Sequence, residues 1–122
     1  MARTAAEMVA EARARVPGIS PEEVAGLGDV LVVDVRDPAE VAATGKVPGA
    51  VNVPRGMLEF RADPASPHHD AAFDPGRTVV LYCASGGRSA LAGAVLQELG
   101  YGDVRNLGGF KDYADKGLPV ER

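Results

Sequence analysis

The sequence predicts an α/β protein whose central parallel sheet is covered by helices on both faces. Short apolar runs such as Val30–Val35 and Thr78–Tyr82 are rich in β-branched residues and do not alternate with polar ones, which is typical of strands buried on both faces of a parallel sheet. Segments with helix-capping residues and helical apolar spacing stand between these runs. Strands that alternate with helices along a chain indicate a parallel sheet.

Two helices are expected before the first strand. Thr4 and Glu7 form a capping-box pattern, in which each side chain accepts a hydrogen bond from the other residue's backbone amide. Apolar residues then recur at helical spacing until Pro17-Gly18 ends the helix. Ser20 caps a second, shorter helix that has a proline at its first position.

The rest of the chain alternates between strands and helices. The expected strands are Val30–Val35, Ala50–Val53, Thr78–Tyr82 and Asp103–Asn106. The expected helices begin at Asp37, near Gly56, at Arg88-Ser89 and near Phe110, and residues 63–75 form a surface loop. In the helix that follows Arg88, one apolar stripe is formed by Leu91, Ala94, Val95 and Leu99.

Length, charge and residue counts exclude several classes of protein. A chain of 122 residues suits one domain, which we place at residues 19–122 after an N-terminal helical extension at residues 1–18. The net charge of −4 argues against a dedicated nucleic-acid binder. No signal-peptide core and no apolar run near the ~20 residues of a membrane span are present, so a cytoplasmic location is expected.

The cysteine and histidine counts limit the metal chemistry. With one cysteine, Cys83, the chain can form neither an intramolecular disulfide nor a cysteine-only zinc site. The two histidines, His68 and His69, are adjacent in a proline-rich segment without a third ligand nearby, so we interpret them as exposed loop residues. No metal and no cofactor are expected.

The position of Cys83 suggests a reactive thiol. It directly follows a buried strand, and ligands of open α/β sheets bind at the carboxyl ends of the strands. Small residues follow it, so the backbone can curl with its amides pointing inward, and the next helix presents its positive end to the same place. Together with Arg88 these groups favour an anion, so we expect the pKa of the thiol to be lowered. The alternative is a small buried hydrophobe, which is common for free cysteines but does not explain the position at a loop.

Four motifs in this order resemble the single-domain rhodanese (thiosulfate sulfurtransferase) family. The motifs are Asp34-Val35-Arg36 with Glu40, Gly45–Ala50 with Asn52–Pro54, the loop Cys83–Arg88, and Gly108–Phe110 before Gly117–Val120. The resemblance runs from about Ile19 to Val120. It implies a rhodanese-like parallel sheet of about five strands with helices on both faces, to which this chain adds its N-terminal helix.

The resemblance also implies an activity. Cys83 would attack the outer sulfur of a donor such as thiosulfate, become a persulfide and pass the sulfur to a thiophilic acceptor, either cyanide or a thiol. Small sulfur anions and thiols would then be the partners, with a protein acceptor as a further option, and neither nucleic acid nor membrane. The residues expected to bind substrate are Ala84, Ser85, Gly86, Gly87, Arg88, Ser89, Asp34, Arg36 and Arg55.

Two of these arginines have structural alternatives. For Arg36 we favour an ion pair with Glu40, four residues on, over direct contact with substrate. Arg55 either reaches the mouth of the pocket or lies on the surface in solvent. The sequence also departs from the family, since Lys46 replaces a frequent histidine and Ala84 a frequent arginine at the second loop position. The missing arginine removes one charge from the pocket rim and leaves room for a persulfide or protein donor.

Two other functions compete with sulfur transfer. Relatives of this family that act on phosphate or arsenate have five residues between cysteine and arginine, whereas four separate Cys83 from Arg88. The shorter ring of amides suits one sulfur atom, so we favour sulfur transfer over a cysteine-dependent phosphatase or arsenate reductase. The other alternative is a non-catalytic module that senses persulfides or binds a protein, and the presence of both the cysteine and the arginine argues against it.

Overall fold

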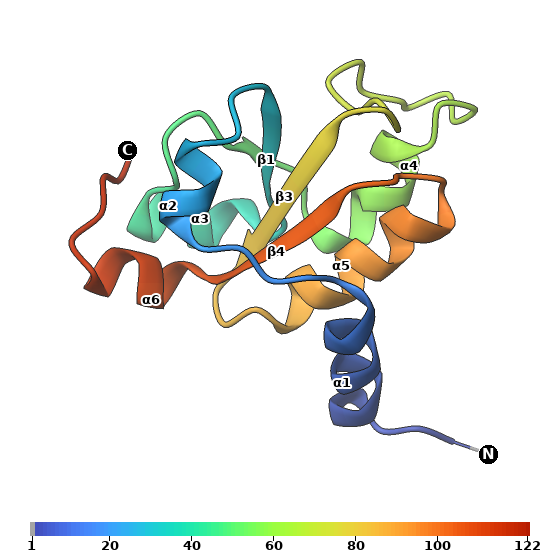
Figure 1. Ribbon diagram of the computed structural model, residues 1–122, viewed down its shortest axis with the longest axis horizontal. Coiled ribbons are helices and arrows are strands. Elements are labelled where there is room, and N and C mark those ends of the chain that lie inside the picture. Colours follow the sequence, from blue (N-terminus) through green and yellow to red (C-terminus); the bar gives the residue numbers. More distant parts are fainter. Residues whose placement is uncertain (1) are drawn as a thin grey trace.

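The computed structural model describes residues 2–122 and confirms the α/β fold (Figure 1). Four parallel strands stand in the order β2-β1-β3-β4. The strands are β1 (Val30–Asp34), β2 (Val51–Asn52), β3 (Thr78–Cys83) and β4 (Val104–Gly109). A fifth position beyond β4 holds only a parallel bridge between Gly18 and Asn106. Pro17 lacks an amide hydrogen and Pro21 begins the next helix, so this segment does not extend into a strand.

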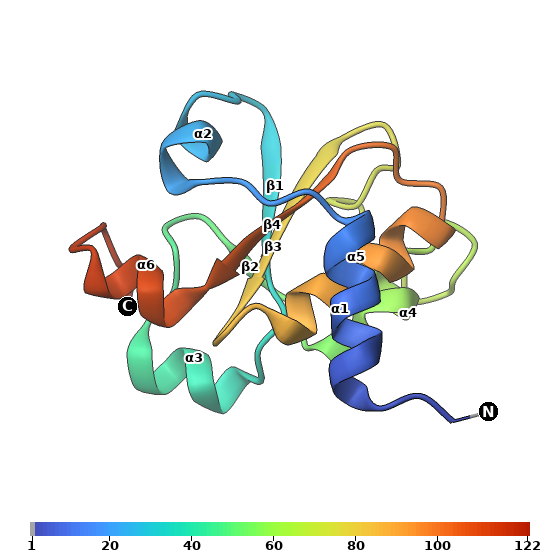
Figure 2. The same ribbon diagram turned by 60° about the horizontal axis from the view of Figure 1, so that its bottom comes forward.

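Helices lie on both sides of the sheet (Figures 1 and 2). The α-helices are α1 (Ala5–Arg15), α2 (Pro21–Ala25), α3 (Pro38–Thr44), α4 (Leu58–Ala62), α5 (Gly87–Glu98) and α6 (Phe110–Asp115), and a 3-10 turn η1 (Arg55–Met57) precedes α4. The views show α1, α4 and α5 on one side and α2, α3 and α6 on the other. The capping box predicted at Thr4 and Glu7 is present, as is a second one at Ser20 and Glu23.

Each face of the sheet has its own apolar core. Val33 and Leu81 belong to the larger core, which the sheet forms with α4, α5 and the end of α1. On the opposite face Tyr82 packs against Phe110 of α6, with the two ring centroids 5.9 Å apart. Side chains of successive strand residues point to opposite faces, so the side chain of Cys83 returns to the face covered by α5.

The buried face of α5 differs from the predicted stripe. Its fully buried residues are Ser89, Ala90, Ala92, Gly93 and Leu96, whereas the stripe residues are only partly buried. Leu91, Ala94 and Val95 instead line a groove of about 230 Å³ that α1 forms with α5. The difference arises because α5 packs against both the sheet and α1, so its buried face is set by these two neighbours and not by the apolar spacing alone.

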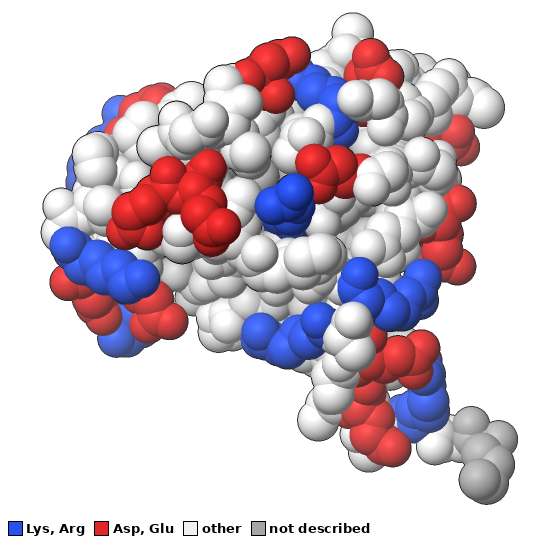
Figure 3. All heavy atoms as spheres, viewed as in Figure 1, with Lys and Arg blue, Asp and Glu red and all other residues white. Residues whose placement is uncertain are grey.

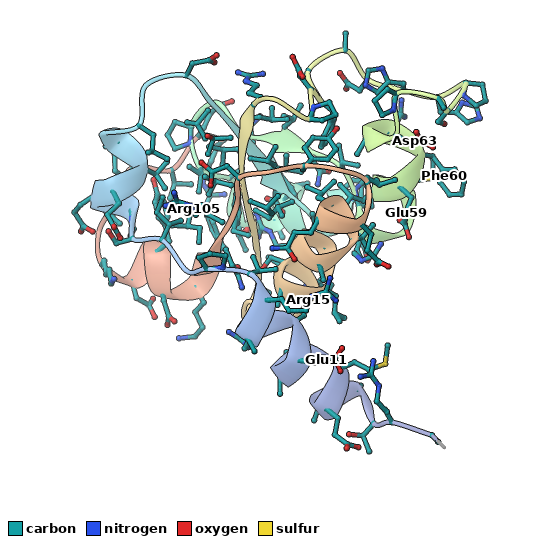
Figure 4. All side chains as sticks on the ribbon, turned by 45° about the vertical axis from the view of Figure 1, so that its right-hand side comes forward. Glu11, Arg15, Glu59, Phe60, Asp63 and Arg105 are labelled. Atoms are coloured by element: carbon teal, nitrogen blue, oxygen red, sulfur yellow. The ribbon has the colours of Figure 1, made fainter. Side chains whose placement is uncertain are left out.

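The N-terminal helix α1 packs beside α5 and shares the core (Figure 2). Val16, which ends α1, belongs to the main core cluster, and Ala12 is also buried. Acidic and basic side chains are interspersed along α1 and on the face of the molecule seen in Figure 3. On α4, Phe60 points away from the body of the molecule and is half-exposed (Figure 4). None of the helices within residues 2–122 is both long enough and apolar enough to cross a membrane.

Candidate active site

Cys83 ends β3 and opens the loop that leads into α5. Its side chain is 1% exposed, and the backbone amide of Gly86 donates a hydrogen bond to Sγ at 3.0 Å. The loop therefore closes over the sulfur and directs a backbone donor at it. This is the arrangement expected from the small residues that follow the strand.

The hydrogen bonds around the sulfur determine its acidity. Burial by itself raises the pKa of the Cys83 thiol, but hydrogen bonds from the hydroxyl and amide of Ser89 and from the amides of Ser85 and Gly86 outweigh it, so the net pKa is lowered. The Ser89 hydroxyl lies 3.5 Å from Sγ and carries a single proton, for which two closer oxygens also compete. The Gly86 amide, at 3.0 Å, therefore makes a shorter hydrogen bond to the resting sulfur than the Ser89 hydroxyl does.

Two glycines allow this tight loop. Gly86 has φ +97°, in the left-handed region that residues with a side chain rarely adopt. At Gly109, the last residue of β4, a Cβ atom would stand 2.7 Å from the carbonyl oxygen of Ala84. The end of β4 can therefore approach the loop only because this residue has no side chain.

Asn106 on β4 joins the strand to the loop. Its Oδ1 accepts hydrogen bonds from the Ser89 hydroxyl at 2.8 Å and the Gly108 amide at 2.9 Å, while its Nδ2 donates to the Gly86 carbonyl at 3.3 Å. The sequence analysis did not include this residue in the site. The available signal was an asparagine within the expected strand, two residues before the Gly108-Gly109 pair.

Arg88 pairs with Glu40, so the predicted pair between Arg36 and Glu40 is wrong. The Arg88 guanidinium donates to both Glu40 oxygens, at 2.8 and 3.0 Å. These hydrogen bonds hold the pKa of Glu40 down at about 2. Residues four apart are neighbours only within a helix, and Arg36 precedes the start of α3 at Pro38. Glu40 is therefore directed toward the first turn of α5.

Arg36 is committed to a buried structural network. Its guanidinium pairs with Asp34, two residues earlier, at 2.7 Å, and also donates to the Thr44 hydroxyl and the Gly45 carbonyl. The same group stacks over the Phe110 ring, 4.4 Å from its centroid. Because Asp34 and Arg36 are both almost fully buried and paired, they shape the end of β1 and leave little capacity for a ligand.

The chain matches the model of the rhodanese-like domain over residues 21–116. It belongs to the rhodanese family. This match confirms the resemblance inferred from the four motifs. The N-terminal helix α1 lies outside the matched residues.

Relatives of this rhodanese domain include named sulfurtransferases. A sulfurtransferase of Allochromatium vinosum is 40% identical over 100 residues, which covers 81% of this chain and 85% of the relative. The thiosulfate sulfurtransferase PspE of Escherichia coli is 38% identical over 82 residues, covering 67% and 72% of the two chains. A solved structure of a Rhodopseudomonas palustris protein of unknown function, described as a possible tyrosine phosphatase, is 37% identical, with a TM-score of 0.90 and coverage of 99% and 96%.

Two cavities flank the rhodanese loop. The larger, of about 490 Å³, borders Ala84 and is also lined by Arg36, Glu40 and Phe110. The smaller, of about 260 Å³, borders Ser85 on the side of β4. The structure thus groups the loop residues, Arg88 and Glu40 around the sulfur. It places Arg55 in the separate groove between α1 and α5, where Arg55 pairs with Glu59 at 2.9 Å.

Proposed function

We propose that this rhodanese is a sulfurtransferase in which Cys83 carries sulfane sulfur from thiosulfate to a thiophilic acceptor. The observation that supports this most is the 3.0 Å hydrogen bond from the Gly86 amide to Sγ, within a four-residue loop that curls around a single sulfur. The sulfurtransferase names of the relatives agree with this reading.

In the first step the Cys83 thiolate attacks the outer sulfur of thiosulfate. A sulfur–sulfur bond forms between Sγ and that atom, and the bond between the two sulfurs of thiosulfate breaks. Sulfite leaves with the electron pair of the broken bond. The thiolate and the thiosulfate dianion thus give a persulfide anion and a sulfite dianion, and the total charge is unchanged. The lowered pKa of Cys83 favours this step because the thiolate is the nucleophile.

In the second step the acceptor takes the outer sulfur. Cyanide attacks it, thiocyanate forms, and the electron pair of the broken bond returns to Sγ as thiolate. The loop amides of residues 84–89 stabilise the persulfide between the two steps, as they stabilise the thiolate. The cavity beside Ala84 lies next to the loop, and we assign it to the acceptor thiol. The chain has one cysteine, so no second thiol of its own can discharge the persulfide.

Arg88 and its partner Glu40 position the loop for this chemistry. The bidentate pair joins the first turn of α5 to α3, and the Arg88 charge is close enough to interact with the Cys83 thiolate. We assign Asp34 and Arg36 to the support of the site, since their polar groups are already paired. A reducing, cytoplasmic setting, which would supply acceptor thiols, remains part of this proposal.

The intact mass of the protein tests the chemistry and the residue together. After treatment with thiosulfate we expect a gain of one sulfur atom, with one equivalent of sulfite released, and subsequent cyanide should remove the sulfur as thiocyanate. The Cys83→Ser variant should show neither change. A mass gain in Cys83→Ser, or an unreactive wild-type thiol, would contradict the proposal; the latter result would favour a non-catalytic module.

A phosphatase is the second candidate. It is favoured by the overall likeness to the Rhodopseudomonas palustris protein described as a possible tyrosine phosphatase. Only four residues separate Cys83 from Arg88, which suits one sulfur better than a phosphate group. Turnover of an aryl phosphate by the wild type, lost in Cys83→Ser, would favour the phosphatase. We expect no such turnover.

A further inference from the structure

The order of the strands marks one place in the sheet for a ligand. Along the chain, β2 is added on one side of β1 and β3 on the other, so the direction of the sheet switches between β1 and β3. In open α/β sheets, ligands bind in the crevice outside the carboxyl ends of the strands at such a switch point. Cys83 is the last residue of β3 and therefore lies at this point.

The cavity of about 490 Å³ beside Ala84 lies in this crevice. Its lining includes residues that follow three neighbouring strands: Arg36 after β1, Ala84 after β3 and Phe110 after β4. It also includes Glu40, whose carboxylate binds Arg88, so the cavity meets the loop 83–88 near both of its ends. Figure 2 shows α3 and α6, which contribute two of its walls, at this end of the sheet.

The uncharged part of the lining is mostly apolar. Ala43, Ala84 and Ala114 line the cavity together with Phe110, and Thr44 is an uncharged polar residue among them. The family frequently has an arginine at the position of Ala84, where this chain has only a methyl group. An apolar wall therefore stands next to the reactive cysteine, where a charged side chain is frequent in relatives.

Most charged side chains of the lining are already held in ion pairs. These pairs have N–O distances of 2.7 to 2.9 Å and are Arg36–Asp34, Arg88–Glu40 and Lys111–Asp115. Two opposite charges this close largely cancel each other a few ångströms away. The remaining charged residue of the lining, Arg122, is exposed, so solvent ions screen it. The cavity therefore has little net charge with which to select an anion.

We infer that this cavity selects sulfur acceptors with an uncharged, apolar body, and that Ala84 is the residue that determines this specificity. The inference rests on the proposed sulfur transfer and adds its acceptor class: organic thiols with an apolar body are preferred over small polar or anionic thiols. The acceptor thiolate forms a bond to the outer sulfur of the Cys83 persulfide, and the bond between that sulfur and Sγ breaks. An organic persulfide anion leaves, and the electron pair returns to Sγ as thiolate.

The persulfide determines how far the acceptor has to reach. The transferred atom is the outer sulfur, which stands about 2 Å from Sγ. Cys83 is almost fully buried, so the acceptor meets this outer atom and not Sγ. Ala84 is bonded directly to Cys83, so the acceptor's apolar body lies against Ala84 and Phe110 while its thiolate meets the outer sulfur.

The test measures discharge of the loaded protein by two uncharged thiols. Cys83 is loaded with thiosulfate, the excess is removed, and loss of the sulfur is followed by intact mass in a single turnover. Phenylmethanethiol carries an apolar ring, and 2-mercaptoethanol carries a hydroxyl group instead. Each rate is divided by that of the same thiol with a small organic disulfide, which removes differences in intrinsic reactivity. We expect the wild type to favour phenylmethanethiol about tenfold, which corresponds to ~1.4 kcal/mol and to roughly 60 Å² of buried apolar surface.

Substitutions to arginine test the role of Ala84. Ala84→Arg should reduce the preference for phenylmethanethiol to less than about threefold, because a charged side chain replaces the apolar wall. It should also speed discharge by mercaptosuccinate, a dicarboxylate, at least about threefold relative to 2-mercaptoethanol. Ala114→Arg changes the wall on α6 and should act in the same direction, which keeps the test decisive if Ala84→Arg disturbs the loop. Ala65→Arg, at an exposed position within residues 63–75, is the matched control and should leave the preference unchanged.

The outcomes separate this inference from the proposed function. A wild-type preference below about threefold, or a tenfold preference retained by both Ala84→Arg and Ala114→Arg, would overturn the acceptor class while sulfur transfer to cyanide stands. An equal loss of preference in Ala65→Arg would overturn the role of Ala84, because the effect would then come from the charge of the whole molecule. If the wild type gains no sulfur from thiosulfate, the proposed function fails and the acceptor class with it.

Discussion

The reactivity of Cys83 depends on a balance between burial and hydrogen bonding. A buried thiol in apolar surroundings is inert, because burial disfavours the charged thiolate. Here the loop amides supply donors at the same point, with the Gly86 amide at 3.0 Å, and the net effect is a lowered pKa. A side chain that is 1% exposed is therefore still expected to react.

The first prediction concerns the pH dependence of that thiol. The alkylation rate of Cys83 follows the thiolate fraction, so a lowered pKa moves the midpoint of the rate to lower pH. We expect the folded protein to have a lower midpoint than the same protein in guanidinium chloride, whose only thiol is again Cys83. Ser89→Ala should raise the folded midpoint only slightly, because two closer oxygens compete with Sγ for the single hydroxyl proton. A folded midpoint at or above the unfolded one would contradict the hydrogen-bond balance.

The second prediction concerns Glu40, whose pKa falls from 4.5 to about 2 through its hydrogen bonds with Arg88. A carboxyl group whose pKa is lowered by folding stabilises the folded protein at pH values above its unfolded pKa. This contribution is lost as the pH falls from 4.5 toward 2. Glu40→Gln should cost about 0.2–1 kcal/mol at pH 7, the range for partly exposed ion pairs. Urea unfolding of both proteins should show this difference shrinking across that pH window. A difference that persists at pH 2 would show that the pair is not its source.

At the residue scale, the acidity of Cys83 could be predicted from its neighbours in the sequence. Which side chains pair with one another in space could not. The expected behaviour of Cys83 followed from its immediate neighbours, which are close in sequence and in space. The partner of Arg36 was wrong because the spacing of four residues was applied outside a helix, whereas the strand end turns Arg36 back onto Asp34. Asn106 was missed because its contacts with Ser89 and Gly86 span 17 and 20 residues.

Among the elements, β4 does more than extend the sheet. Asn106 holds the loop from the middle of this strand, and Gly109 lets the strand end approach Ala84. The strand itself could be predicted, at Asp103–Asn106, because it depends on the order of local segments along the chain. The buried face of α5 could not, because it depends on the packing of α1 against that helix, which places Leu91 toward the groove and Gly93 toward the core.

The third prediction tests this role of β4. Asn106→Ala leaves the Gly86 carbonyl and the Gly108 amide without their side-chain partner, which should cost about 1–3 kcal/mol of unfolding free energy. Hydrogen–deuterium exchange of the loop 83–89 should also become faster, since the loop loses its brace. Asn52→Ala is the matched control, because Asn52 donates to backbone carbonyls of residues 34 and 36. It should reduce stability without speeding exchange in the loop. Faster exchange in both variants would indicate general destabilisation instead.

For the whole molecule, the main structural question is whether α1 is an appendage or part of the folded unit. Val16 fills the space above Gly93 on α5, and its Cγ atoms stand 2.8 and 2.9 Å from the position of a Cβ atom there. Such close packing requires a residue without a side chain on α5. The sequence division at residue 18 separates α1 from the domain, whereas Val16 lies in the same core as the sheet.

The fourth prediction measures that coupling. Val16→Ala removes two buried methyl groups and should cost about 1.5–3 kcal/mol of unfolding free energy. Gly93→Ala gains about 0.5–1 kcal/mol of helix propensity. Its Cβ would overlap with Val16, so the net effect in the wild type should be destabilising by about 1–3 kcal/mol. Met8→Ala, at a half-exposed position of α1, is the control and should change stability by less than about 0.5 kcal/mol.

The double variant, Val16→Ala with Gly93→Ala, decides whether α1 is an appendage or part of the folded unit. Once Val16 is shortened, the two closest contacts of a Cβ atom on Gly93 are gone, the next is Val104 at 3.3 Å, and the Cβ partly fills the vacated space. Val16→Ala with Gly93→Ala should therefore be more stable than the sum of the single changes by at least about 1 kcal/mol. Guanidinium unfolding should remain one transition for all three variants. Additive effects, or a separate early transition for α1, would show that the helix folds apart from the domain.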